Sequence, residues 1–136
     1  MSRIKWREKL NWTEENLEDL RITGYSYLKQ GKYEIALPLF EALSIVDPES
    51  AYDIQTLGAL YLQIGNPLKA MQCFEKALKL ETDHAPTLLN LTKALLMLGK
   101  REEALRLARL LTQEPNSKVS NMAKALLLAW NPKMES

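Results

Sequence analysis

The chain has 136 residues, of which 46% are apolar and 26% are charged, and its formal net charge is +1. This composition is typical of an ordinary soluble domain with room for one core. The small net charge excludes a broad electrostatic field, so we expect neither a nucleic-acid partner nor attraction to an anionic membrane.

Three features predict a cytoplasmic protein that does not insert into a membrane. The uncharged apolar runs reach only about ten residues, which is too short to span a bilayer. The first residues lack the apolar segment and cleavage site of a secretory signal. The one cysteine, Cys73, cannot form an internal disulfide, which favours a reducing compartment.

Residues 1–12 form an N-terminal extension in which basic and apolar side chains alternate. Its basic residues are Arg3, Lys5, Arg7 and Lys9, and its apolar residues are Ile4, Trp6, Leu10 and Trp12. Two interpretations stay open: an arm that contacts a partner, or a leader whose apolar residues cover the first helix.

The first long helix is predicted from Thr13 to about Gln30. Thr13 suits an N-cap and is followed by two glutamates, which favour the positive end of the helix dipole. Trp12 and Leu17 lie where a hydrophobic staple would pack. Gly31 ends the helix with the backbone freedom that a tight turn needs.

The second helix is predicted over about residues 32–46, with one apolar stripe made by Ile35, Leu39, Leu43 and Val46. Pro38 lies inside this helix, where it cannot donate a backbone hydrogen bond and favours a kink. Pro48 prevents the helix from continuing.

Four further helices and a terminal one follow at regular spacing. Asn66 is the expected cap of the fourth, with Pro67 well placed at its first position, and Ser117 is the expected cap of the last. The predicted ranges are about 51–64, 66–81, 85–99, 101–113 and 117–130.

The last helix carries Leu126, Leu127, Leu128 and Trp130 close together, which is more apolar surface than one buried face uses. A helix that covers the open end is what a stack of repeats requires. Whether these residues make a wide contact with the preceding helix or a self-association surface stays open.

All five glycines fall into two columns of a 34-residue repeat: Gly24 and Gly58 in one, and Gly31, Gly65 and Gly99 in the other. Such self-similarity indicates stacked helical hairpins. Gly58 is predicted to face Ala70 and Phe74, because a residue without a side chain lets two helices approach closely. The third repeat has Thr92 and Ala108 at the corresponding positions, so we expect it to pack differently.

The first helix of each hairpin is expected to line the inner wall of the stack, and the stripe on it that points away from the partner helix is rich in apolar residues. This pattern predicts a groove for an apolar peptide, although the terminal helix folding over part of it is an alternative. The predicted groove residues are Tyr25, Leu28, Tyr52, Gln55, Ala59, Leu62, Leu89, Lys93 and Leu96.

The sequence offers little support for catalysis, and we expect no enzyme, no cofactor and no metal site. His84, the one histidine, lies in a turn between repeats and is expected to be a cap or surface residue. Cys73 lies between packing residues, which favours a buried, inert thiol. We find neither a phosphate-binding glycine loop nor a nucleophile elbow.

The repeat residues resemble the tetratricopeptide repeat family, whose period is 34 residues. A narrower resemblance lies in the segments 31–43 (GKYEIALPLFEAL), 47–48 (DP) and 57–59 (LGA), within a similarity that covers about residues 17–110. These segments resemble the class II chaperones of bacterial type III secretion, which hold translocator proteins before export. We expect a departure from that family in the absence of its long N-terminal dimerisation region.

The resemblance implies an all-α fold: a right-handed superhelical stack of three tetratricopeptide hairpins within residues 13–118 and a capping helix and tail over 119–136. The three repeats would span about residues 17–50, 51–84 and 85–118.

The resemblance also implies a non-enzymatic chaperone in the bacterial cytoplasm that holds a protein client, either a translocator or a needle subunit. A generic tetratricopeptide scaffold for complex assembly is the alternative function. A homodimer or a hetero-chaperone complex through the termini is left open.

Overall fold

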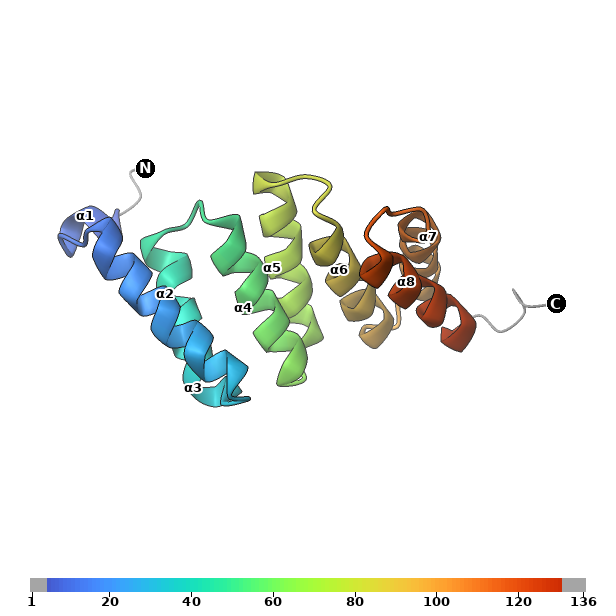
Figure 1. The fold of residues 1–136 in the computed structure, drawn as a ribbon, viewed down its shortest axis with the longest axis horizontal. Coiled ribbons are helices and arrows are strands. Elements are labelled where there is room, and N and C mark those ends of the chain that lie inside the picture. Colours follow the sequence, from blue (N-terminus) through green and yellow to red (C-terminus); the bar gives the residue numbers. More distant parts are fainter. Residues whose placement is uncertain (1–4, 131–136) are drawn as a thin grey trace.

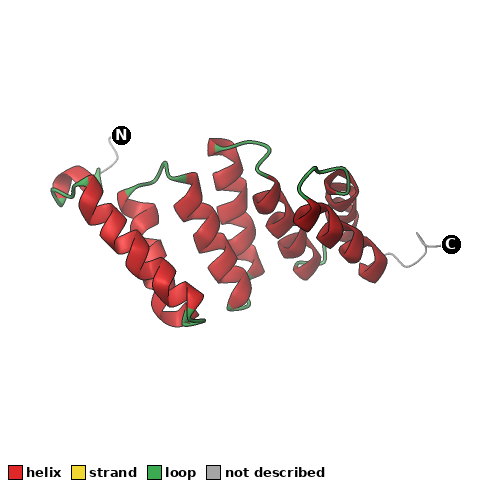
Figure 2. Ribbon diagram, in the orientation of Figure 1, coloured by secondary structure: helices red, strands yellow, loops and turns green. Residues whose placement is uncertain are grey.

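The structure is a computed structural model that describes residues 5–130, and it contains no strand within that range (Figure 2). The expected all-α fold is therefore confirmed. The helices are α1 (Trp6–Lys9), α2 (Glu14–Lys29), α3 (Tyr33–Val46), α4 (Ala51–Gln63), α5 (Pro67–Leu80), α6 (Ala85–Met97), α7 (Arg101–Leu111) and α8 (Ser117–Trp130).

The long helices pair into three consecutive hairpins, α2 with α3, α4 with α5 and α6 with α7, which stack side by side (Figure 1). Helix α8 follows at the C-terminal end and packs against α7 and α6. The predicted hairpin breaks are confirmed at Gly31, Gly65 and Gly99, whose φ angles are 75°, 82° and 78°. Residues with a side chain rarely adopt this left-handed backbone conformation, which explains why a glycine follows the first helix of each hairpin.

The two helices of the first and second hairpins touch at a glycine, as the repeat pattern predicts. A Cβ atom at Gly58 would lie 2.5 Å from Cε1 of Phe74, and one at Gly24 would lie 2.8 Å from Cε2 of Phe40. Both phenylalanines are fully buried. The rings therefore occupy the space that a side chain on the facing helix would need.

The third hairpin fills the corresponding space with a different pair. Thr92 and Ala108 are both fully buried, and the Thr92 hydroxyl donates to the backbone carbonyl of Leu88 at 2.9 Å. The larger side chain has moved from the second helix to the first, which is the different packing that the sequence predicts.

The prediction of which α3 residues face inward is correct for two of its four residues. Leu43 and Val46 are buried, but Leu39 is half-buried and Ile35 is exposed. The inward face instead includes Ala36 and Phe40, because these residues pack against α2 around Gly24.

Helix α8 is capped by Asn116 rather than by Ser117, which is its first helical residue. The Asn116 side-chain oxygen accepts hydrogen bonds from the backbone N–H groups of Lys118 at 3.0 Å and Val119 at 3.4 Å. The predicted cap was thus one residue too late.

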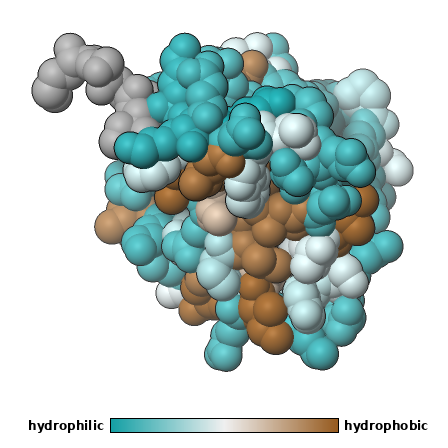
Figure 3. All heavy atoms as spheres, turned by 90° about the vertical axis from the view of Figure 1, so that its left-hand side faces the viewer, coloured by the Kyte–Doolittle hydropathy of each residue, from teal (hydrophilic) through white to brown (hydrophobic). Residues whose placement is uncertain are grey.

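The N-terminal extension partly covers the first hairpin. Trp12 packs against the core cluster that contains Leu17, as expected for a staple, and Arg7 forms an ion pair with Glu14. Trp6 and Leu10 stay exposed, and a band of apolar side chains is visible on this end of the stack (Figure 3). Arg3 and Ile4 of the predicted arm lie outside the described residues.

The contact between Gly58 and Phe74 makes a testable pair. Gly58→Thr should destabilise the protein by about 1–3 kcal/mol through overpacking, and Phe74→Ala should cost about 3–5 kcal/mol through a cavity. The double variant recreates the pair of the third hairpin, so its loss should be smaller than the sum of the single losses. Denaturant unfolding of the four proteins measures this coupling, and additive losses would show that the two side chains do not share one space.

Candidate peptide-binding face

The candidate site lies on the side of the stack formed by the first helices α2, α4 and α6, here called the first-helix face (Figure 1). It contains a hollow of about 450 Å³ between α2 and α4. The hollow is lined by Glu18, Arg21, Ile22, Tyr25, Ser26, Lys29 and Tyr52.

Two tyrosines form the aromatic part of this hollow. Tyr25 on α2 is 42% exposed and Tyr52 on α4 is 45% exposed. Partial burial raises the pKa of the Tyr52 phenol above its ordinary value, and the neighbouring Tyr25 raises it further by a smaller amount. The Lys29 ammonium lies 5.2 Å from the centre of the Tyr25 ring, within cation–π range. The hollow thus offers two ring surfaces with a cation at one edge.

The structure divides the predicted groove residues into three classes of exposure. Tyr25 and Tyr52 are exposed, whereas Leu96 is only 6% exposed and packs with Leu95 and Ala104. The prediction that Leu96 lies on an open face is therefore wrong. The remaining predicted residues are half-buried: Leu28, Gln55, Ala59, Leu62, Leu89 and Lys93.

The hollow also includes residues that the sequence interpretation missed. Ile22 is 60% exposed and lies beside Tyr25 in the lining. The sequence did contain a sign of this position. Ile22 is apolar where the other two repeats carry the polar residues Thr56 and Asn90, and it lies one turn before Tyr25. An exposed β-branched side chain here adds apolar surface that folding does not use.

An ion pair joins α2 to α4 at the hollow, whose lining includes Arg21. The Arg21 Nε and Nη2 atoms donate to the two carboxylate oxygens of Asp53, each at 2.7 Å. Nη2 also donates to Asp47 at 3.3 Å, and Nη1 donates to Glu18 at 2.8 Å. Asp53 is fully buried, so Arg21 is the charge that compensates it.

This arrangement limits what Arg21 can do for a ligand. Each of its three guanidinium nitrogens already donates to a carboxylate, and the hydrogen bond to Asp53 raises the pKa of Arg21 further above its usual value. The side chain is therefore permanently charged and occupied. Because Asp53 directly follows Tyr52 and Arg21 lies one turn before Tyr25, the ion pair holds the two tyrosines on opposite sides of the hollow.

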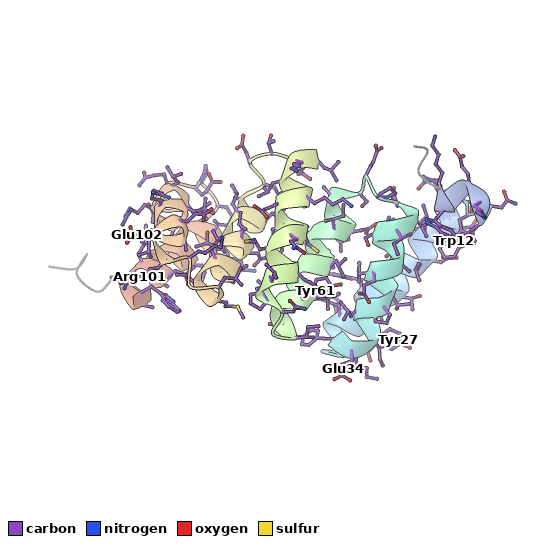
Figure 4. All side chains as sticks on the ribbon, turned by 180° about the vertical axis from the view of Figure 1, so that it is seen from behind. Trp12, Tyr27, Glu34, Tyr61, Arg101 and Glu102 are labelled. Atoms are coloured by element: carbon purple, nitrogen blue, oxygen red, sulfur yellow. The ribbon has the colours of Figure 1, made fainter. Side chains whose placement is uncertain are left out.

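The other residues with chemical potential lie away from the hollow. The Nδ1 atom of His84 lies 2.7 Å from the hydroxyl oxygen of Thr87, and its side chain makes no capping bond to the backbone. Cys73 is half-buried rather than buried, and burial raises the pKa of its thiol to about 11. On the opposite side of the stack, where Figure 4 labels Tyr61, the Tyr61 hydroxyl donates to Glu41 at 2.8 Å.

Two kinds of feature are absent from residues 5–130. No group of three histidine, cysteine, aspartate or glutamate side chains in that range is arranged to hold a metal ion. None of the helices there combines the length and the hydrophobicity needed to span a membrane.

Comparison with family models gives a match over more than half of the chain. The model described as anaphase-promoting complex, cyclosome, subunit 3 matches residues 29–111. Superkiller complex protein 3 of Mus musculus is 31% identical over 77 residues, and the human protein of that name matches equally. The matched stretch is 57% of this chain but 5% of that protein, so the chain spans about a twentieth of the length of these curated relatives.

Several solved structures share the fold. PcrH of Pseudomonas aeruginosa, in complex with the chaperone binding region of PopD, gives a TM-score of 0.79 at 23% identity and covers 90% of this chain and 96% of its own. SycD of Yersinia enterocolitica, in complex with a peptide of the translocator YopD, gives a TM-score of 0.79 at 23% identity, and the match covers 90% of this chain and 97% of SycD. The first tetratricopeptide unit of Spaghetti (RPAP3), bound to the HSP90 peptide SRMEEVD, gives a TM-score of 0.77 at 23% identity, and the match covers 91% of this chain and 97% of that unit. At these identities the likeness shows the fold alone.

Breaking the ion pair of Arg21 with Asp53 from one side should strongly destabilise the protein. Replacing Arg21 by Met leaves the fully buried carboxylate without a partner, which should cost about 3–5 kcal/mol in unfolding free energy. Glu18→Gln, at the exposed end of the same cluster, is the matched control and should change stability by less than about 0.5 kcal/mol. Urea titrations compare them, and equal losses in the two variants would refute the assignment.

The raised pKa of Cys73 predicts slow thiol chemistry. A rise from about 9 to about 11 lowers the thiolate fraction at pH 8 on the order of a hundredfold, and the thiolate is the reactive form. Iodoacetamide should therefore modify the folded protein far more slowly than the urea-unfolded chain at pH 8, and the difference should shrink as the pH approaches 11. Equal rates in the two states at pH 8 would contradict the burial of the thiol.

Proposed function

The chain belongs to the family described as anaphase-promoting complex, cyclosome, subunit 3, a family of tetratricopeptide repeat proteins, and from this membership we propose that it binds a protein segment on the first-helix face. The observation that carries the proposal is the pair of exposed tyrosines at the hollow between α2 and α4. Aromatic side chains that are exposed in the free protein and desolvated in a complex commonly supply most of the binding energy.

More specifically, we propose a chaperone of type III secretion in the bacterial cytoplasm that holds an apolar segment of an export substrate. The repeat residues that resemble class II chaperones support this function. So do the solved structures of PcrH with a segment of PopD and of SycD with a peptide of YopD, which share the fold over nearly their whole length. The client would be a translocator or a needle subunit.

The chemistry of the hollow suggests what the segment presents. Tyr25, Tyr52 and Ile22 provide ring and aliphatic surface, and Lys29 and Glu18 are the charged groups at the rim. An aliphatic or aromatic client side chain would fit between the rings, and a flanking carboxylate would be favourable near Lys29. The half-buried residues Gln55, Ala59, Leu62, Leu89 and Lys93 would extend the contact along α4 and α6. We keep these residues as the proposed path of the segment.

A general scaffold for complex assembly is the second candidate, favoured by the likeness to Superkiller complex protein 3 and to the unit of Spaghetti that binds an HSP90 peptide. That peptide, SRMEEVD, ends in acidic groups. Recognition of such an end needs free cations on the face, and Arg21 is already occupied by Asp53, Asp47 and Glu18. The cations left on the first-helix face are Lys29 on α2 and Lys93 on α6, and two lysines on different helices suit an apolar client better than a clustered acidic tail.

The first test identifies the client. The chain is isolated from its own source without a tag, and the proteins that come with it are identified by mass spectrometry. An exported protein with an apolar segment is the expected result. Recovery of only assembly factors that are not exported would favour the scaffold instead.

The second test concerns the two tyrosines. The double change Tyr25→Ala with Tyr52→Ala should weaken binding of the client segment on the order of a thousandfold, since about 1.4 kcal/mol is tenfold and two buried aromatic anchors at about 2 kcal/mol each carry about 4 kcal/mol. The melting temperature should move little, because both rings are exposed in the free protein. Ile45→Ala, an exposed apolar residue on α3, is the matched control and should leave affinity unchanged. Calorimetric titration measures both variants, and equal affinities would move the binding site elsewhere.

A further inference from the structure

The hollow between α2 and α4 carries opposite charges at its two ends. All of its lining residues except Tyr52 lie on α2, so the hollow is a strip along one side of that helix, here called the α2 strip. Glu18 lies at one end of the α2 strip and Lys29 at the other, and Ile22 and Tyr25 lie between them. The strip therefore places apolar surface between an acidic group and a basic group.

The end near Glu18 has a surplus of negative charge. Asp53, Asp47 and Glu18 all accept hydrogen bonds from the one guanidinium of Arg21. Three carboxylates around one cation leave two negative charges uncompensated when all four groups are ionised. The N-terminus of α4, where Asp53 lies in the first turn, offsets part of this charge. The Glu18 side chain is the most exposed of the three carboxylates, at 58%, so it presents the surplus to a ligand.

The opposite end of the α2 strip presents a cation. Lys29 is exposed, and no carboxylate among residues 5–130 lies within ion-pair distance of it. Its ammonium lies 5.2 Å from the centre of the Tyr25 ring, a contact that compensates an exposed charge only weakly. The helix dipole favours a lysine on any side of the last turn, so the dipole alone does not explain why this one lies over the ring.

The separation of the two charges indicates the form of the ligand. Lys29 follows Glu18 by eleven residues, which is about 16 Å along a helix axis. An extended chain advances about 3.3 Å per residue, so about five residues span this distance. A helical ligand would need a second wall along its length, but α4 contributes only Tyr52 to the lining.

We propose that the α2 strip selects an extended, dipolar segment. A basic side chain would lie at Glu18, an apolar one between Tyr25 and Tyr52, and an acidic one at Lys29, about five residues from the basic one. This inference rests on the proposed binding of a client at the hollow. Exposed ion pairs add little affinity each, but a segment with the wrong charges meets like charges at both ends, which gives the site specificity.

The first test selects phage-displayed random peptides on the full chain. The wild type should enrich peptides in which a basic and an acidic residue flank an apolar one, about five residues apart. Lys29→Glu should enrich peptides with a basic residue in place of the acidic one. Lys124→Glu, which changes an exposed lysine on α8 away from the hollow, is the matched control and should select the same peptides as the wild type.

Fluorescence anisotropy then measures one enriched peptide in synthetic form. Lys29→Glu should weaken its binding about tenfold, because one attraction is replaced by a repulsion of similar size. Exchanging the acidic residue of the peptide for lysine should restore binding to Lys29→Glu and weaken binding to the wild type. A structural role for Lys29 alone would not produce this exchange of preference.

The outcomes separate this inference from the function on which it rests. Peptides that require Tyr25 and Tyr52 but show no charge pattern would overturn the inference and leave the proposed function standing. So would peptides that bind Lys29→Glu as well as the wild type, or charges about eleven residues apart, which indicate a helix. If no selected peptide depends on the two tyrosines, the proposed function fails and the inference fails with it.

Discussion

The contact between a glycine on the first helix and a phenylalanine on the second determines how each of the first two hairpins packs. At Gly58 there is no room for even a Cβ atom beside Phe74, and Gly24 has the same relation to Phe40. In the third hairpin a different pair of fully buried side chains, Thr92 with Ala108, occupies the corresponding positions. Because the contact recurs every 34 residues, the first helices fall side by side, and one continuous face results.

A different interaction connects the first hairpin to the second and gives the face its chemical character. Arg21 reaches from α2 to the buried Asp53 on α4, so the tyrosines next to these residues lie across one hollow. Because Arg21 already donates to carboxylates of the chain, a ligand cannot readily use it as a hydrogen-bond donor. The exposed surface that is left is mainly aromatic and aliphatic, which suits an apolar segment better than an acidic one.

Much of this arrangement could be predicted from the sequence, because glycine has a physical meaning wherever it recurs. The columns of Gly24 and Gly58 and of Gly31, Gly65 and Gly99 predicted the close contacts and the hairpin breaks. The rotation of individual helices could not be predicted as well. A difference of one residue decides whether Ile35 or Ala36 faces inward, and Leu96 is buried although Tyr25 and Tyr52 on the same predicted stripe are exposed. The pairing of Arg21 with Asp53 joins charges 32 residues apart, and in the sequence neither differs from a surface charge.

The central claim is that the first-helix face binds a client segment at the hollow between α2 and α4. The most direct measurement is a crystal structure of the chain together with a segment of the protein that co-purifies with it. The segment should lie along α2 and α4, with an apolar side chain between the rings of Tyr25 and Tyr52 and the ion pair of Arg21 and Asp53 unbroken beneath it. A segment bound to the opposite side of the stack, along α3 and α5, or to the exposed side of α8 would contradict the claim.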